Sequence, residues 1–424
     1  MTDEFATIPD RIRAHAAARP DSDALLQDGE RLSYAELDAL MDRIAASLQR
    51  DGVAPQQSIA ICASTSIDYA ALFLGALRAG VAVAPIAPSS TPEQIVGMVA
   101  DSGAKRFFLD AEVEAALRGV PHDVSVPRTA FEAFDAWLEP DGAVPAPVAI
   151  QPDWPFNIIY SSGTTGTPKG IVQSHGMRFQ HVNRGEASGY GADAVTLLST
   201  PLYSNTTLVS FFPTLALGGA VVLMKKFDAR RYLELAQAHR VTHTMLVPVQ
   251  YSRMMALAEF DQADLSSFRV KFCTSAPFGA ALKAEILRRW PGGLIEFFGM
   301  TEGGGSCALV AHEHPDKLHT VGRPIPGHDI RLIDEEGREV PVGEIGEIVG
   351  ASAATMNGYH NQPGKTAEAT WVSPEERRYI RTGDVGRFDA DGFLTLMDRK
   401  KDMIISGGFN IYPSDLEAVV RGHP

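Results

Sequence analysis

The sequence predicts an α/β fold of stacked sheets covered by helices, followed by a small β-rich subdomain. Short apolar segments alternate with amphipathic stretches of helical period between residues 58 and 297, and this alternation is typical of largely parallel sheets. After about Gly322 the pattern changes to strand-like segments joined by Gly and Asp turns. A chain of 424 residues is also too long for one ordinary core, so we expect two or more subdomains.

The α/β part is expected to contain eight buried strands with helices between them. These strands are Ser58–Cys62, Val81–Ile86, Arg106–Leu109, Ala194–Ser199, Ala220–Met224, Thr244–Val247, Val270–Cys273 and Leu294–Phe297. Ser33 with Glu36, and Thr91 with Gln94, form capping-box patterns that predict helix starts. The segment Pro140–Pro152 is rich in Pro and Ala and is the expected internal linker.

The β-rich part is expected to contain further strands joined by tight turns. They are Asp329–Ile333, Glu347–Val349, Tyr379–Thr382 and Phe393–Met397. Asp391-Gly392 is a strong hairpin signal. A charged run at 398–401 then precedes a segment in which Ser414 with Glu417 predicts one more helix start.

Composition and charge exclude several classes of function. The hydrophobic and charged fractions, 45% and 21%, are those of a globular protein. A net charge of −14 argues against a nucleic-acid binder or a protein bound to an anionic membrane surface. The longest apolar run, Leu208–Met224, is interrupted by Pro213 and Gly218-Gly219, so we expect a buried helix leading into a strand rather than a membrane span. Three separated cysteines and an N-terminus without a signal-peptide pattern predict a cytoplasmic location.

The most informative segment is Tyr160–Gly170, which reads YSSGTTGTPKG. Glycines let backbone N–H groups approach an anion, hydroxyls donate hydrogen bonds and lysine neutralises charge, so this loop is suited to a polyphosphate. It does not fit the G-x-x-x-x-G-K-[ST] pattern, because Pro168 stands at the second glycine and Gly170 follows Lys169. The loop therefore predicts phosphate binding, but not by a P-loop NTPase.

Three further polar clusters interrupt the apolar pattern downstream of this loop. They are FGMTE at 298–302, RTGD at 381–384 and DRKKD at 398–402. Together with the loop, in this order, they resemble the motifs of the adenylate-forming superfamily, which includes acyl-CoA synthetases, amino-acid adenylation domains and beetle luciferases. The resemblance extends from LSYAELDALMDRIAASLQRDGV near the start to GGFNIYPSDLEAVV near the end. It implies the N-terminal core of that superfamily, with stacked α/β sheets and a small β-barrel-like subdomain.

The resemblance implies that a carboxylic acid is joined to AMP with release of pyrophosphate, and that a thiol, usually that of coenzyme A, then displaces AMP. ATP, Mg²⁺ and coenzyme A as co-substrate are the implied cofactors. Because the acid and the nucleotide are both anions, catalysis must come from positioning and charge neutralisation rather than from a general base.

The implied catalytic residues are Thr301, which would contact the α-phosphate, Glu302, which would hold Mg²⁺, and Lys169. Carboxylate oxygen is the ligand type that this hard cation prefers. The residues that would grip the β- and γ-phosphates are Ser161, Ser162, Gly163, Thr164, Thr165, Gly166 and Lys169.

The remaining nucleotide contacts are also implied by the resemblance. The residues concerned are Ser275, Ala276, Pro277, Phe298, Gly299, Thr301, Asp384 and Arg399. Phe298 would stack on adenine, and Asp384 would accept both ribose hydroxyls, a task suited to a two-oxygen acceptor. Arg399 would reach the ribose or a phosphate. Lys401 occupies the hinge position of the family.

The implied substrate pocket is formed by Tyr203, Ser204, Asn205, Gln250, Tyr251, Thr274, Gly303, Gly304 and Gly305. The three glycines are expected to leave room for a ring or a medium-length chain. Ser204 stands where many acyl- and aryl-CoA ligases carry His, so that the usual gating role of this position is in doubt. The sequence also lacks the aspartate that amino-acid adenylation domains use for the α-amino group, which argues against an amino-acid substrate.

The expected organisation is a first α/β subdomain with the phosphate loop at 1–190, a second with the acyl and adenine pocket at 191–325, a β-rich subdomain at 326–397, and the hinge with the start of a lid domain at 398–424. The family's lid extends on the order of 100 residues past the hinge, a normal small-domain size, and its catalytic lysine, in a P-K-T-x-x-G-K-like run, is absent here. We therefore expect a truncated core with little adenylation activity.

The expected function is ATP-dependent activation of an aryl or medium-chain acid, followed by thioester formation with coenzyme A. Two alternatives stay open: transfer of the acyl group to a carrier-protein phosphopantetheine, and a nucleotide-binding module without turnover. The expected partners are a small carboxylic acid and coenzyme A, with no nucleic acid and no membrane. The sequence leaves a homodimer open.

Overall fold

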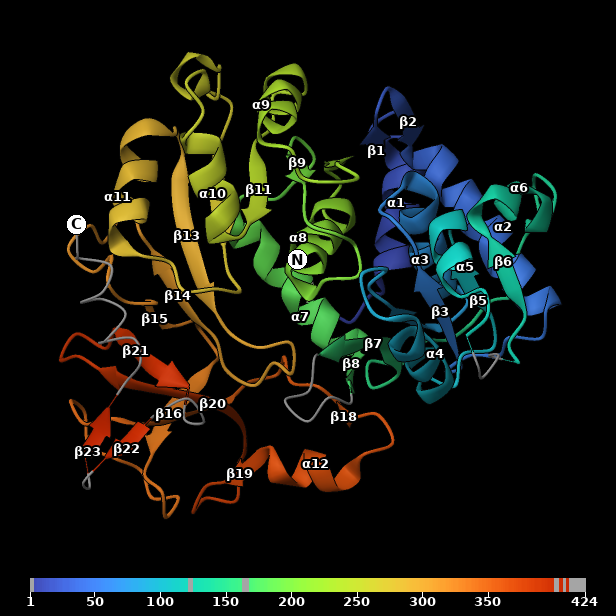
Figure 1. Ribbon diagram of the computed structural model, residues 1–424. Coiled ribbons are helices and arrows are strands. Elements are labelled where there is room, and N and C mark those ends of the chain that lie inside the picture. The colour runs from blue at the N-terminus through green and yellow to red at the C-terminus, as the bar shows by residue number, and fades with distance from the viewer. Residues whose placement is uncertain (1–3, 121–124, 162–167, 400–403, 407–408, 412–424) are drawn as a thin grey trace.

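The computed structural model describes residues 4–120, 125–161, 168–399, 404–406 and 409–411. Figure 1 shows two α/β lobes side by side, with a β-rich part beneath them that is formed by the later part of the chain. This arrangement confirms the predicted α/β fold with a small β-rich subdomain.

The first lobe is built on a seven-stranded sheet in the order β18-β8-β7-β4-β3-β5-β6. Its strands are β3 (Ser58–Cys62), β4 (Ala82–Pro85), β5 (Phe107–Leu109), β6 (Arg128–Ala130), β7 (Pro155–Ser161), β8 (Lys169–Ser174) and β18 (Gly358–Tyr359). Strands β3 to β7 pair in parallel, and β8 is antiparallel to both β7 and β18. Its helices are α2 (Tyr34–Arg50), α3 (Ile67–Arg78), α4 (Pro92–Asp101), α5 (Ala111–Ala116) and α6 (Phe134–Trp137).

The second lobe is built on a nine-stranded sheet in the order β15-β14-β13-β12-β11-β9-β10-β1-β2. Its strands are β1 (Asp23–Gln27), β2 (Glu30–Ser33), β9 (Val195–Leu198), β10 (Ala220–Leu223), β11 (His243–Leu246), β12 (Val270–Cys273), β13 (Gly293–Phe298), β14 (Cys307–Val310) and β15 (Arg323–Pro324). Its helices are α7 (His175–Gly185), α8 (Asn205–Ala216), α9 (Ala229–Ala238), α10 (Pro248–Met255) and α11 (Ala280–Arg289). All eight strands expected in the α/β part are present, within one or two residues of their expected ends.

The hairpin β1–β2 pairs with a strand that lies far from it in the sequence. Leu25 of β1 pairs in parallel with Val221 of β10, so the N-terminal hairpin completes the sheet of the second lobe. Asp28 and Gly29 join the two strands with φ of 48° and 90°, the left-handed conformation that a tight hairpin turn requires. The Asp-Gly pair was visible in the sequence, but the hairpin was not among the expected elements.

The third sheet forms the β-rich part, in the order β16-β17-β20-β19 with β21 paired to β20. Its elements are β16 (Asp329–Ile333), β17 (Gly346–Ala351), α12 (Pro363–Glu368), β19 (Thr370–Val372), β20 (Arg378–Phe388) and β21 (Leu394–Arg399). The turn at Asp391-Gly392 joins β20 to β21, as its sequence predicted. A separate hairpin of β22 (Ile404–Ser406) and β23 (Phe409–Ile411) follows.

Helices α3 and α8 lie between the two α/β sheets. One hydrophobic cluster joins Phe156 on β7 to Val221 on β10. Between them, Phe73 of α3 contacts Phe156 and Phe212 of α8, with ring centroids 6.2 and 5.5 Å apart. A helix covered on both sides needs apolar residues all round, which explains the apolar run Leu208–Met224 that covers most of α8 and β10.

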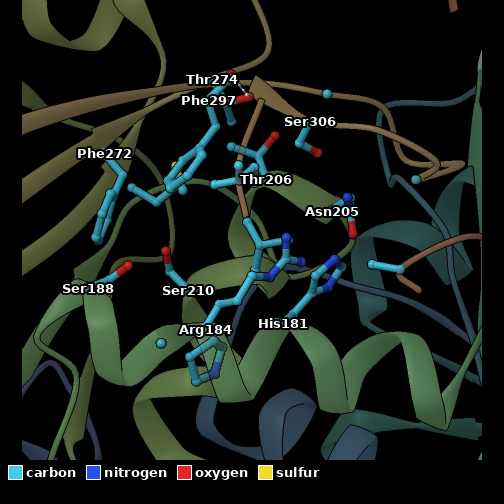
Figure 2. Close-up of a pocket in the computed structure, with 18 of the residues that line it drawn as sticks. His181, Arg184, Ser188, Asn205, Thr206, Ser210, Phe272, Thr274, Phe297 and Ser306 are labelled. Atoms are coloured by element: carbon cyan, nitrogen blue, oxygen red, sulfur yellow. Dashed lines mark hydrogen bonds between the residues drawn. The ribbon is translucent and has the colours of Figure 1, made fainter. Parts of the chain in front are cut away.

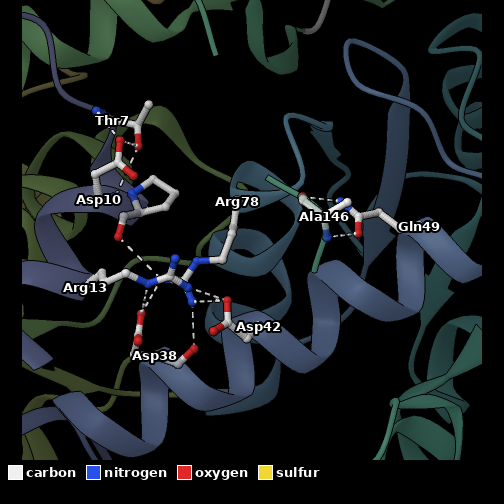
Figure 3. Close-up of polar contacts among 9 residues, drawn as sticks. Thr7, Asp10, Arg13, Asp38, Asp42, Gln49, Arg78 and Ala146 are labelled. Atoms are coloured by element: carbon white, nitrogen blue, oxygen red, sulfur yellow. Dashed lines mark hydrogen bonds and ion pairs between the residues drawn. The ribbon is translucent and has the colours of Figure 1, made fainter. Parts of the chain in front are cut away.

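The N-terminal helix α1 (Ile8–Ala18) is tied to α2 and α3 by a half-buried charge cluster (Figure 3). The Arg78 guanidinium donates to the Asp42 carboxylate at 3.0 Å and to the Asp38 carboxylate, and Arg13 of α1 pairs with the same two aspartates. The Arg78 side chain is only 6% exposed, so these carboxylates offset a charge that would be costly to bury alone.

Local signals at helix starts also behave as predicted. The capping boxes at Ser33 with Glu36 and at Thr91 with Gln94 are both formed.

The expected linker 140–152 contains no helix or strand. It is held to α2 by two hydrogen bonds of 2.9 and 2.8 Å between the Gln49 amide and the backbone of Ala146 (Figure 3).

Candidate active site

The hairpin β7–β8 carries the predicted phosphate loop. Ser161 at the end of β7 pairs with Lys169 at the start of β8, so the two ends of the loop are fixed side by side. Five loop residues predicted to bind phosphate lie outside the described residues: Ser162, Gly163, Thr164, Thr165 and Gly166.

Lys169 and Glu302 meet at a tyrosine that sequence reasoning did not single out. Tyr359 lies on β18, beside β8. The Lys169 Nζ lies 5.1 Å from the centroid of its ring, and its hydroxyl donates to Glu302 Oε1 at 2.9 Å. Burial and the Glu302 carboxylate raise the pKa of Tyr359, so the phenol stays protonated as a donor. No spacing pattern marks Tyr359, because its position depends on how β18 joins the first sheet.

Thr301 is held from behind by a buried polar network. Gln173 Nε2 on β8 donates to the Thr301 carbonyl at 2.6 Å. Arg178 of α7 donates to the side-chain oxygens of Asn157 at 3.0 Å and Asn205 at 2.9 Å, and also to that of Gln173. Burial lowers the pKa of Arg178 to about 9. The network connects both lobes to the segment that follows β13, and so fixes Thr301 relative to the hairpin that carries Lys169.

A cavity of about 500 Å³ opens beside Thr301 (Figure 2). Most of its surface is apolar, supplied by Tyr190, Val209, Pro213, Met245, Phe272, Phe297, Phe298, Met300, Ile325, Pro326 and Ala354. Its polar lining comes from His181, Asn183, Arg184, Ser188, Asn205, Thr206, Ser210, Thr274, Ser275, Thr301 and Ser306. Such a site can hold an apolar ligand body and orient it through a few polar groups.

Part of the predicted nucleotide set lies along this cavity. Phe298 ends β13, is 9% exposed and lines the cavity together with Gly299 and Ser275. Ser275 adopts a left-handed φ of 78°, and its hydroxyl is 2.7 Å from that of Thr206. Ala276 and Pro277 follow in an exposed turn.

Asp384 and Arg399 lie opposite each other on β20 and β21 of the β-rich part. The Asp384 N–H donates to Thr382 Oγ1 at 3.0 Å. Gly383 between them has a left-handed φ of 73°. Asp384 is not among the residues that line the cavity. The hinge residue Lys401 lies outside the described residues.

The predicted substrate-pocket residues separate into two groups. Asn205, Thr274 and Gly303 line the cavity, and Tyr203, Ser204, Gln250, Tyr251, Gly304 and Gly305 do not. The Gln250 amide instead donates to Ser199 Oγ at 3.1 Å and accepts from the Val247 N–H. The Tyr251 hydroxyl donates to the Phe272 carbonyl at 2.9 Å within the core.

Gly304 and Gly305 permit close backbone packing, whereas Gly303 lines the cavity. A Cβ on Gly305 would lie 2.0 Å from Ile330 Cδ1 and 2.8 Å from Gly350 Cα, and one on Gly304 would lie 2.6 Å from the Gly350 carbonyl oxygen. Gly304 also has a φ of 82°, which favours glycine. These residues therefore dock the segment after β13 onto the β-rich sheet.

Glu302 fits the requirements of a Mg²⁺ ligand. Tyr359 bonds one of its carboxylate oxygens, and Glu302 forms no salt bridge within the described part of the chain. Among described residues, no group of three or more His, Cys, Asp or Glu could hold a metal alone. Mg²⁺ is commonly held by one or two carboxylates together with substrate phosphates, so Glu302 beside a nucleotide is a sufficient protein contribution.

The family described as AMP-binding enzyme matches residues 12–360 of this chain. The chain belongs to this adenylate-forming superfamily. The match spans both α/β lobes and ends just after Tyr359, and it therefore contains the Lys169–Tyr359–Glu302 contact.

Named members of the superfamily are similar to this chain along nearly all of its length. It is 31% identical to a fatty acid–[acyl-carrier-protein] ligase of Streptomyces coeruleorubidus, over 99% of this chain and 82% of that protein. It is 32% identical to an indoleacetate–CoA ligase of Aromatoleum aromaticum, over 97% of this chain and 82% of that protein. A fatty acyl CoA synthetase of Mycobacterium tuberculosis superimposes with a TM-score of 0.86 at 27% identity, over 99% of this chain and 83% of that one.

Among the residues that the structure describes, no helix is both long and apolar enough to cross a bilayer.

Proposed function

We propose that this chain uses ATP to convert an aryl or medium-chain carboxylic acid into an acyl adenylate with release of pyrophosphate, and then passes the acyl group to the thiol of coenzyme A. The observation that carries the proposal is the convergence of Lys169, Tyr359 and Glu302 next to Thr301, beside a largely apolar cavity.

The chemistry of these groups suits a reaction between two anions. Lys169 would neutralise the outer phosphates, and Glu302 would bind Mg²⁺, which supplies further positive charge when it is present. Thr301 would orient the α-phosphate towards the acid in the cavity. Rate enhancement in such a site comes from positioning and electrostatic stabilisation, and these residues supply both without a general base.

The remaining roles are proposed on the same basis. Phe298 and the 275–277 turn would hold adenine, since Phe298 and Ser275 line the cavity. Asp384 would accept the ribose hydroxyls and Arg399 would contact the ribose or a phosphate. These two residues pair on β20 and β21 of the β-rich part, so this part of the chain would contribute to the nucleotide site.

The acceptor can be coenzyme A or the phosphopantetheine of a carrier protein. Coenzyme A is our first proposal, supported by the similarity to the indoleacetate–CoA ligase. The similarity to the fatty acid–[acyl-carrier-protein] ligase favours the carrier as the second candidate.

The test is pyrophosphate release from ATP with a panel of aryl and medium-chain acids, followed by incubation with coenzyme A or a holo carrier protein. We expect acid-dependent pyrophosphate release and a coenzyme A thioester. A thioester on the carrier alone would support the second candidate. ATP binding without pyrophosphate release with any acid would contradict both, and would leave a nucleotide-binding module.

A further inference from the structure

A row of basic side chains follows one face of α7. Arg178, His181 and Arg184 are spaced three residues apart, so they project from neighbouring turns on the same side of the helix. Arg178 belongs to the network behind Thr301, whereas His181 and Arg184 line the cavity. In Figure 2 the Arg184 side chain rises from α7 into the cavity, next to His181 and below Thr206.

Arg184 has no carboxylate partner within the described part of the chain. Its Nη1 lies 2.7 Å from His328 Nε2, and its Nε donates to the Gln180 carbonyl at 3.2 Å. Arg78, which is also little exposed, pairs with two aspartates, and the buried Arg178 donates to the side-chain oxygens of Asn157, Gln173 and Asn205. A guanidinium withdrawn from water without a counter-charge is costly, and burial lowers the pKa of Arg184 accordingly.

His328 cannot satisfy both groups that point at it. The Ser306 N–H lies 3.0 Å from His328 Nδ1, while Arg184 Nη1 approaches Nε2. A neutral imidazole has one accepting nitrogen, and a protonated one has none. Burial and Arg184 lower the pKa of His328 to about 4, so the ring is neutral near pH 7. One of the two donors therefore needs a second acceptor, which a group in the cavity can supply.

His181 adds a second incomplete group at the same place. Its Nδ1 is buried and has no hydrogen-bond partner. Burial lowers the pKa of His181, and the charges of Arg184 and Arg178 lower it further. With these histidines neutral, Arg184 makes this part of the cavity locally positive in a protein of net charge −14.

Arg184 lies further along α7 than Arg178, the residue that supports Thr301. Gln173 and Arg178 support Thr301 at the start of α7, and Arg184 follows six residues later, which corresponds to about 9 Å along a helix. Thr301 and Arg184 line the same cavity, whose lining also includes the apolar side chains of Val209, Phe272 and Phe297. A ligand with one end at Thr301 would thus present an apolar body to these residues and its other end to Arg184.

We infer that the acid activated by this chain is a diacid, with a ring or a short methylene chain between two carboxylates, and that the carboxylate remote from the reaction binds Arg184. The inference rests on the proposed function, because it assigns the first carboxylate to the adenylation site. The second carboxylate would supply the missing counter-charge of Arg184 and would accept from the donor that His328 leaves unsatisfied.

The test compares matched acids that differ only in the second carboxylate: terephthalate with benzoate, and adipate with hexanoate. Binding to the full chain is measured by calorimetry, and kcat/KM by pyrophosphate release. We expect the diacid of at least one pair to exceed its monoacid by about 10- to 100-fold, the usual effect of a hydrogen bond to a charged group. Equal values within both pairs, or no binding of any member, would overturn the inference.

Variants assign the preference to Arg184. Arg184→Gln should reduce the affinity for the diacid far more than that for the monoacid, whereas Arg184→Lys should keep part of the preference. Arg230→Gln is the matched control, because Arg230 is exposed on α9 and pairs with Glu259. A diacid preference that survives in Arg184→Gln contradicts the inference. The calorimetric arm does not depend on turnover, so failure of the proposed function appears separately, as an absence of pyrophosphate release with every acid.

Discussion

Tyr359 shows how one side chain can organise two charged groups of opposite sign. Its ring faces the Lys169 ammonium and its hydroxyl donates to the Glu302 carboxylate. A direct contact between the two charges would satisfy both and leave neither available to phosphate or to a metal. The neutral tyrosine keeps them apart while it restricts their positions, which is a form of preorganisation.

At this scale the first prediction concerns Glu302. Glu302→Gln removes the charge that would hold Mg²⁺ but keeps the shape of the side chain. Pyrophosphate release should fall by about 10²- to 10³-fold, as for loss of one preorganised electrostatic group, and added Mg²⁺ should no longer strengthen ATP binding. Glu313→Gln, at an exposed position, is the control. A wild-type response to Mg²⁺ in Glu302→Gln would contradict the assigned role.

The second prediction separates the two contacts of Tyr359. Tyr359→Phe keeps the ring beside Lys169 and removes one hydrogen bond, so kcat/KM should fall by about 2- to 10-fold. Tyr359→Ala removes the ring as well and should cost more. The activities are compared by pyrophosphate release at saturating Mg²⁺. Wild-type activity in both variants would show that Tyr359 does not position either charge.

The site residues that could be predicted from sequence are those that lie within a local motif. Lys169, Thr301 and Glu302 belong to short segments whose residue types suit phosphate and Mg²⁺. Tyr359 and Gln173 act through contacts that exist only after distant strands have paired. The basic row on α7 does have a sequence signal, because three basic residues recur at helical spacing, but their lack of carboxylate partners depends on the surrounding elements.

At the level of single elements, two helical glycines distinguish a residue needed for close helix packing from one that only lowers helix stability. A Cβ on Gly75 of α3 would lie 2.6 Å from Ile44 Cβ of α2, whereas one on Gly97 of α4 would meet nothing within 4 Å. Gly75 therefore sets how closely α3 approaches α2. Gly97 has no such role and carries only the entropic cost of glycine in a helix.

The third prediction uses this pair as its own control. Gly75→Ala should lower the free energy of unfolding by about 1–3 kcal/mol, because overpacking displaces α2 from α3. Gly97→Ala should raise it by about 0.5–1 kcal/mol through higher helix propensity. Urea unfolding of both variants measures the two values. The same sign of change in both would refute the packing argument.

The segment at 303–305 illustrates the limit of element-level prediction. Three consecutive glycines beside a pocket were expected to leave space for the substrate. The structure uses Gly304 and Gly305 to bring the chain against Gly350 of β17. Glycine permits both uses equally well, and only the approach of a distant strand decides between them.

On the scale of the whole molecule, buried neutral histidines couple stability to pH. His175 and His243 are 3% and 0% exposed, and burial lowers the pKa of each to about 4. The unfolded chain, with histidines near pKa 6.5, therefore binds more protons than the folded one between about pH 6.5 and 4. Stability is full above this window and is lost as the pH falls through it.

The fourth prediction tests this coupling at His243, which stacks on Tyr190 with ring centroids 4.6 Å apart. In His243→Gln the free energy of unfolding should depend less steeply on pH, by about 1 kcal/mol per pH unit between pH 6 and 4.5, because one proton fewer is taken up. His319→Gln, at an exposed position, should keep the wild-type slope. Urea unfolding across the pH series gives all three slopes, and an unaltered slope in His243→Gln would be decisive against the prediction.

Most strands were predictable because parallel strands buried on both faces appear as continuous apolar runs. Ser58–Cys62 and Val270–Cys273 were predicted with their observed ends. Which strands share a sheet was not predictable in the same way. The hairpin β1–β2 has a clear turn signal at Asp28-Gly29, yet nothing near it in the sequence indicates that its partner is β10.

That pairing affects the order in which the protein can fold during synthesis. Leu25 can pair only after Val221 has been synthesised. At about 5–20 residues per second, a ribosome needs about 10 to 40 s to extend the chain from Leu25 to Val221. For that time the apolar side of the N-terminal hairpin remains without its sheet and open to chaperones. The second lobe cannot close before much of the first has left the ribosome, so the two lobes should mature almost together.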